Sequence, residues 1–208
     1  MMPDPARLIL IRHGETDNNV SRVFRGPEGG QSPLNAEGFQ QAQKLAHSLK
    51  ALNLPRPRVY ASTYLRAQQT AQAIADALGV PLQVLNDIHE IDTGAFAGRP
   101  YAHMTEFLHE MTAPDGQFGF PGGESLAGVG ERFHRALVGV LPQACETVLI
   151  VSHGAALVAI LSKLLELDPR ETWLSDTHHH ENTAVTELVW NESGQPEVIR
   201  LADAGHLL

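Results

Sequence analysis

Two short apolar runs, each followed at once by a histidine and a glycine, constrain the fold of this chain most strongly. Leu8–Ile11 leads into Arg12-His13-Gly14, and Val148–Val151 leads into Ser152-His153-Gly154. Runs of branched apolar residues are typical of strands buried on both faces, as in a parallel sheet. Open α/β sheets bind ligands beyond the carboxyl ends of their parallel strands, so both histidines are expected at one site.

Helical patterns alternate with further strand-like segments along the chain. We expect one helix to begin at Asn35, and a second to begin at Ser62 or Thr63 and end at Gly79. Two more helices are expected after Ser125 and after His153, with strands over 59–61, 82–85, 183–190 and 197–201. This alternation predicts an α/β fold, a three-layer α/β/α sandwich around a mainly parallel sheet, with residues 1–208 in a single domain.

The stretch over about 98–124 departs from this alternation. It is rich in Gly and Pro toward its end and shows only a short helical pattern near 103–111. We interpret it as an insertion that forms a lid over the site. Its charged residues are mostly acidic, and no Lys or Arg occurs between Pro100 and Glu131. Such a lid predicts a preference for a ligand with a neutral, partly apolar body over one that carries additional anionic groups.

The charge balance and the single cysteine limit the partners and the compartment. The chain has 15 basic and 24 acidic residues and a net charge of -9, which argues against a general binder of nucleic acid or anionic membranes. No apolar stretch approaches the roughly 20 residues that span a bilayer, and the first residues lack a signal-peptide pattern. Cys145 has no partner for a disulfide, and we interpret it as a small buried residue. We expect a cytoplasmic protein; the oligomeric state stays open.

Three further polar residues are expected near these strand ends. Arg66 lies in the first turn of the helix after 59–61, Glu90 follows the strand-like segment 82–85, and Asn19 comes six residues after His13. Guanidinium groups match phosphate oxygens, a neutral imidazole can attack phosphorus, and a carboxylic acid can protonate a leaving oxygen. Two arginines, two histidines and one carboxylate together indicate phosphoryl transfer. The expected partner is a small phosphorylated metabolite.

Further short motifs accompany these residues in a characteristic order. They are Arg12–Thr16 with Asn19, Ser32–Asn35 with Gly38 and Gln41-Ala42, Ala61–Ala71, His89–Ile91, Gly94–Gly98, Pro121–Ser125 and Ser152–Gly154. The set resembles the histidine phosphatase superfamily, the phosphoglycerate mutase-like proteins, and in particular its phosphatase branch. The resemblance covers nearly the whole chain.

This resemblance implies a role for eight residues. His13 would be the nucleophile that carries the phosphoryl group, Glu90 the general acid and then the base, and His153 a further catalytic residue beside the phosphate. The phosphate would also be bound by Arg12, Asn19, Arg66, Gly26 and the backbone N–H of Gly154. No metal and no other cofactor is implied.

Some of these residues also allow a structural interpretation. Arg12 and Arg66 could form ordinary ion pairs with Glu15 or Glu90. The run His178–His180 suggests a metal site, but adjacent residues on a strand point to opposite faces and no third ligand has the spacing that zinc needs. We interpret these histidines as structural or as part of the substrate rim.

Three functions are compatible with the sequence. The first is a metal-independent phosphatase of the histidine acid phosphatase type, which hydrolyses small phosphate monoesters through a phosphohistidine. The second is a cofactor-dependent phosphoglycerate mutase, which would need extra cations over the site, and the stretch 100–131 supplies none. The third, a non-catalytic regulatory protein on the same fold, predicts the loss of at least one site residue, whereas all are present.

Overall fold

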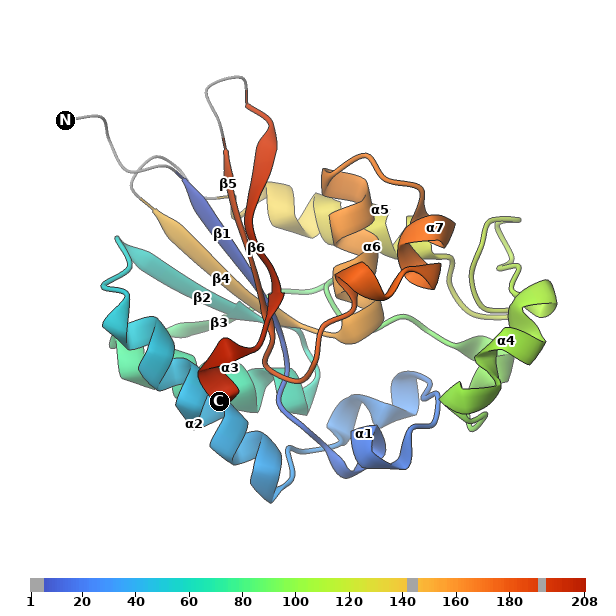
Figure 1. Ribbon diagram of the computed structural model, residues 1–208, viewed down its shortest axis with the longest axis horizontal. Coiled ribbons are helices and arrows are strands. Elements are labelled where there is room, and N and C mark those ends of the chain that lie inside the picture. Colours follow the sequence, from blue (N-terminus) through green and yellow to red (C-terminus); the bar gives the residue numbers. More distant parts are fainter. Residues whose placement is uncertain (1–5, 142–145, 191–193) are drawn as a thin grey trace.

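One mixed sheet forms the centre of the protein. The computed structural model describes residues 6–141, 146–190 and 194–208. In this part of the chain six strands are arranged in the order β3-β2-β4-β1-β5-β6 (Figure 1). Strands β1, β2, β3 and β4 are parallel, whereas β5 runs antiparallel to β1 and β6 antiparallel to β5. The strands span Arg7–Arg12 (β1), Pro57–Ala61 (β2), Leu82–Val84 (β3), Thr147–Ser152 (β4), Val185–Trp190 (β5) and Pro196–Asp203 (β6).

The central strands are buried on both faces, as their apolar runs predict. Leu8 and Leu10 of β1 face a core that includes residues of α5 and α6, whereas Ile9 and Ile11 face a second core with residues of α2 and α3. The two cores lie on opposite sides of the sheet because successive side chains of a strand point to opposite faces. The expected three-layer sandwich is therefore confirmed (Figure 1).

Most helices begin and end where the sequence signals place them. Asn35 caps α2 by accepting a hydrogen bond from the Gly38 N–H, Ser125 caps α5 in the same way, and Gly79 ends α3 with φ 70°. The cap predicted at Ser62 or Thr63 is wrong: Tyr64 precedes α3 and gives no side-chain cap. The helices span Asp17–Ser21 (α1), Ala36–Ala51 (α2), Leu65–Leu78 (α3), Met104–Phe107 (α4), Leu126–Val138 (α5), Gly154–Leu164 (α6) and Pro169–Leu174 (α7).

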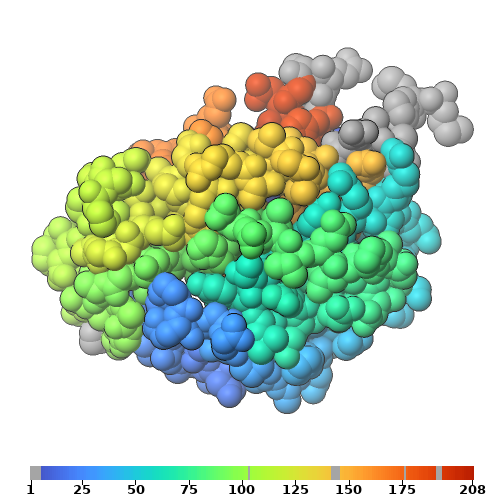
Figure 2. Space-filling view, turned by 180° about the vertical axis from the view of Figure 1, so that it is seen from behind, coloured from blue at the N-terminus to red at the C-terminus, as the bar shows by residue number. Residues whose placement is uncertain are grey.

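The segment 98–124 packs firmly against the rest of the fold. Phe120 and Met111 are buried in the core that α5 and α6 share. The backbone of residues 22–24 pairs with that of 98–101, and Figure 2 shows the blue surface of the N-terminal loop against the green surface of this region. Helices α1 and α4 lie beyond the carboxyl ends of the parallel strands (Figure 1). In the described part of the chain, no helix is long and apolar enough to cross a membrane.

Candidate active site

His13 lies immediately after β1 and is held in one tautomer. Its side chain is buried, with 2% of the residue exposed. Nδ1 donates to the carbonyl oxygen of Gly14 at 2.7 Å, so the lone pair of the neutral ring is on Nε2. The Arg66 Nε–H donates to that Nε2 at 3.0 Å. His13 therefore presents an unprotonated nitrogen beside a guanidinium group.

The surroundings of His13 favour the neutral ring. Burial lowers its pKa well below 6.5, and the positive charges of Arg66 and Arg12 lower the pKa further. The hydrogen bond to Gly14 acts in the opposite direction but does not outweigh them. At neutral pH the imidazole is uncharged, which is the form that can act as a nucleophile.

His153 follows β4 and lies directly behind His13. The two ring centroids are 5.1 Å apart, which confirms the prediction that the two strands bring their histidines together. His153 is fully buried, and it does not line the cavity itself. Its Nε2 lies 2.6 Å from the Ser62 hydroxyl oxygen, whereas Nδ1 is buried with no partner among the described residues. Ser62, expected to cap a helix, thus orients this imidazole instead.

The two arginines are each anchored by a backbone carbonyl. Arg12 Nη1 donates to the His180 carbonyl at 2.6 Å, and Arg66 Nη1 donates to the Gly29 carbonyl at 2.8 Å. Neither guanidinium group forms an ion pair with Glu15 or Glu90, which a purely structural role of these arginines would require. Both arginines line the cavity, and guanidinium groups bind anions through their N–H donors.

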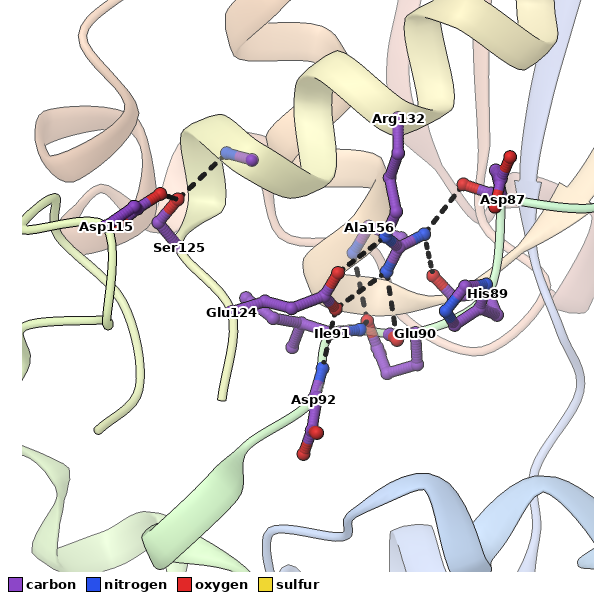
Figure 3. Close-up of polar contacts among 11 residues, drawn as sticks. Asp87, His89, Glu90, Ile91, Asp92, Asp115, Glu124, Ser125, Arg132 and Ala156 are labelled. Atoms are coloured by element: carbon purple, nitrogen blue, oxygen red, sulfur yellow. Dashed lines mark hydrogen bonds and ion pairs between the residues drawn. The ribbon is translucent and has the colours of Figure 1, made fainter. Parts of the chain in front are cut away.

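Glu90 caps the helix that follows His153. Its Oε1 accepts from the Ile91 and Ala156 N–H groups at 3.0 Å each (Figure 3). Its Oε2 accepts from the Ala155 N–H at 3.3 Å. The first N–H groups of a helix have no partner within the helix, so α6 is capped by a carboxylate from a distant segment. Gly154, the first residue of α6, lies beside Glu90 at the cavity wall.

Asn19 and Gly26 also reach the cavity wall, with different partners. The Asn19 Oδ1 accepts from the Thr16 N–H and hydroxyl groups, which fixes its amide at the start of α1. The Gly26 N–H donates to Glu28 Oε1 at 3.1 Å. A ligand would therefore have to displace Glu28 before it could bind the Gly26 backbone.

A cavity of about 370 Å³ joins these residues. Seven of the eight residues named from the sequence line it, and His153 is the exception. Three further residues line the same cavity and were not expected from the sequence: Arg22, Arg25 and Tyr64. The signal for the two arginines is their position three and six residues after Asn19; Tyr64 stands two residues before Arg66.

The run His178–His180 forms no metal site in the part of the chain that the structure describes. His180 Nδ1 donates to the His178 carbonyl, and its Nε2 lies 2.7 Å from the Thr186 hydroxyl oxygen. Among the residues that the structure describes, no group of three or more His, Cys, Asp or Glu side chains could hold a metal ion. Cys145, interpreted above as a small buried residue, lies outside the described residues.

Comparisons with known proteins identify the family of this chain. A sequence model of the histidine phosphatase superfamily (branch 1) matches residues 8–204. A probable phosphoglycerate mutase, GpmB of Salmonella choleraesuis (strain SC-B67), is 30% identical over 193 residues, which are 90% of this chain and 86% of the relative.

Two solved structures show the same fold. YhfR of Bacillus stearothermophilus superposes with a TM-score of 0.80 at 28% identity and covers 97% of this chain and 99% of its own. A phosphoserine phosphatase of Entamoeba histolytica, solved with 3-phosphoglyceric acid, superposes with a TM-score of 0.79 at 26% identity and the same coverage.

Proposed function

Because the chain belongs to the histidine phosphatase superfamily, we propose that it hydrolyses small phosphate monoesters through a phosphohistidine formed on His13. The observation that carries the proposal is the neutral His13, with its lone pair on Nε2 and the Arg66 N–H directly beside it. No metal takes part in the proposed reaction, and a cytoplasmic location stays a prediction.

The first step transfers the phosphoryl group to His13. An incoming phosphate oxygen replaces Nε2 as the acceptor of the Arg66 N–H, which frees the lone pair for attack on phosphorus. Arg12 and Arg66 spread the charge of the transferring group over their guanidinium donors. The bond from phosphorus to the leaving oxygen breaks, and Glu90 in its acid form gives that oxygen a proton.

The second step releases phosphate. Glu90, now a carboxylate, takes a proton from a water molecule that attacks phosphorus, and the bond to His13 Nε2 breaks. The Arg12 anchor at the His180 carbonyl and the Arg66 anchor at the Gly29 carbonyl hold the cations in place during both steps. Such prepared donors need no reorganisation during the reaction.

Arg22 and Arg25 alter the expected charge preference of the substrate body. The lid sequence alone predicts that a second anionic group is repelled. The cavity also contains these two arginines, which the sequence analysis did not place there. We therefore propose that a carboxylate on the substrate is accepted, in keeping with the similar phosphoserine phosphatase solved with 3-phosphoglyceric acid. Arg25→Gln should raise KM for phosphoserine and leave KM for p-nitrophenyl phosphate unchanged.

A phosphoglycerate mutase is the second candidate, favoured by the 30% identity to a probable enzyme of that kind. A mutase must retain a doubly charged intermediate. Arg22 and Arg25 supply cations at the cavity wall, whereas the stretch 101–130 contains no Lys or Arg. The two activities separate in one assay: 3-phosphoglycerate is incubated with and without 2,3-bisphosphoglycerate. Inorganic phosphate is the product expected here; efficient conversion into 2-phosphoglycerate would favour the mutase.

The nucleophile is tested with His13→Ala. The variant should fold normally and release no phosphate, and the wild type quenched during turnover should carry acid-labile, base-stable phosphate. His47→Ala is the matched control because His47 is exposed on α2. Wild-type turnover by His13→Ala would refute the proposed function.

A further inference from the structure

Arg132 on α5 uses all five N–H donors of its guanidinium group, although it lies outside the cavity wall. Only 7% of the residue is exposed. Nη1 donates to the carbonyl oxygens of Asp87 at 2.7 Å and His89 at 2.9 Å, and Nη2 donates to that of Glu90 at 3.2 Å (Figure 3). The other two bonds, from Nε and Nη2, go to the Glu124 carboxylate at 2.8 and 3.0 Å. An arginine has five such donors, so this one is saturated.

Glu124 completes the attachment of the same segment. Its Oε2 also accepts from the Asp92 N–H at 2.9 Å (Figure 3). The neighbouring Ser125 caps α5, and its hydroxyl donates to Asp115 at 2.6 Å, which fixes the chain beside Glu124. The pair Arg132 and Glu124 therefore binds the segment 87–92 from one side, through three carbonyl groups and one N–H group.

The carboxylate of Glu90 lies on the other side of this segment. It is bonded to the first turn of α6 and lines the cavity. Residues 85–93 contain no helix or strand, so no regular ladder of hydrogen bonds positions Glu90. The remaining carbonyl of this stretch, that of Ile88, accepts from the Ser152 hydroxyl at 2.7 Å. Together with the three bonds from Arg132, all four carbonyls of 87–90 therefore accept from side chains.

An ion pair between a buried guanidinium group and a partly exposed carboxylate is not explained by stability alone. Its electrostatic gain is offset at least in part by the cost of removing the Arg132 charge from water. Burial by itself would raise the pKa of Glu124, but the hydrogen bonds from Arg132 and the Asp92 N–H outweigh burial and lower that pKa. The pair thus stays charged, and the three Arg132 N–H groups that do not bind Glu124 are directed at the segment that carries Glu90.

We infer that Arg132 and Glu124 are positioning residues that hold Glu90 where it can protonate the leaving oxygen. The inference rests on the proposed function of Glu90 as the general acid. Neither residue touches the reacting atoms. A displacement of Glu90 by about 1 Å can cost on the order of 100-fold in rate, so loss of the clamp should weaken proton transfer specifically.

The test compares two substrates with nearly the same body. p-Nitrophenyl phosphate has a leaving group that departs without protonation, whereas the alkoxide of p-nitrobenzyl phosphate needs a proton. The quantity to measure is kcat/KM, because it reports the steps up to departure of the leaving group. The variants are Arg132→Met, Arg132→Lys and Glu124→Gln, with Glu90→Gln as the reference and Arg135→Met, exposed on the same helix, as the control.

Glu90→Gln should lower kcat/KM for p-nitrobenzyl phosphate by roughly 100-fold or more, the usual range for general acid catalysis. Arg132→Met should lower it by roughly 10- to 100-fold while p-nitrophenyl phosphate loses less than about 3-fold. Arg132→Lys should not restore activity, since lysine has three donors for five acceptors. Arg135→Met should match the wild type with both substrates.

Two outcomes would overturn the inference. An equal loss with both substrates would indicate a general structural role, and no loss with either would show that Glu90 is placed without the clamp. If Arg132→Met does not fold, the same comparison with Arg132→Lys and Glu124→Gln decides. Failure of the proposed function is distinguishable, because His13→Ala would then retain activity and no phosphoenzyme would form, whatever the Arg132 variants do.

Discussion

The buried His180 should make the stability of this protein depend on pH between 7 and 4. Only 3% of the residue is exposed, and both ring nitrogens have partners. Nδ1 donates to the His178 carbonyl at 3.0 Å, and Nε2 can accept from the Thr186 hydroxyl, whose oxygen also accepts from the Ala202 N–H. A proton on Nε2 would remove this acceptor. The ring is therefore held in its neutral form.

The magnitude follows from the pKa of His180. Burial lowers it from its ordinary value of 6.5 to about 4, with a smaller contribution from the charge of Arg12. Above pH 6.5 the ring is neutral in both the folded and unfolded chain and contributes nothing. Below pH 6.5 only the unfolded chain binds the proton, so stability falls as the pH falls. The loss is about 2 kcal/mol at pH 5 and approaches about 3 kcal/mol below pH 4, at 1.36 kcal/mol per pKa unit.

The free energy of unfolding is measured with urea at pH 7 and pH 5 for the wild type and for His180→Asn. The wild type should lose more stability than the variant over this interval, by about 2 kcal/mol. His47→Asn, at an exposed position, should behave as the wild type. NMR titration of the His180 ring measures the same pKa directly in the folded protein. A pKa near 6.5, or an equal pH dependence in both proteins, would refute the reasoning.

Three further predictions concern the site and its support. Arg66→Met should raise the lowered pKa of His13, because the charge of Arg66 disfavours a protonated ring. The pH below which kcat/KM declines should then move toward 6.5; an unchanged pH profile would exclude charge coupling between Arg66 and His13. Gly38→Ala should lower the free energy of unfolding by about 1–3 kcal/mol or more, because its new Cβ would overlap the backbone of Glu15. Gly139→Ala, where the nearest atom is 3.7 Å from a new Cβ, should change stability far less. Phosphate release should survive EDTA and be inhibited by vanadate; restoration by a divalent ion after loss in EDTA would contradict the metal-free mechanism.

The parts of the fold that the sequence predicted are those coded by local patterns. The buried strands β1 and β4, the caps at Asn35 and Ser125, and the stop at Gly79 each depend on residues a few positions apart. The convergence of His13 and His153 was also predictable, since both follow parallel strands and such strands end at one edge.

Only the tertiary structure decided which groups hold those residues in place. Ser62 contacts His153 across 91 residues of sequence, and Glu90 caps α6 across 65 and 66 residues. Arg132, which no periodic pattern distinguishes from the other charged residues of its helix, reaches the carbonyls of Asp87, His89 and Glu90 across more than 40 residues. Local propensities extend over a few residues, whereas these bonds depend on how the layers pack. The sequence therefore determines which chemistry meets at the edge of the sheet, and the packing determines how that chemistry is oriented.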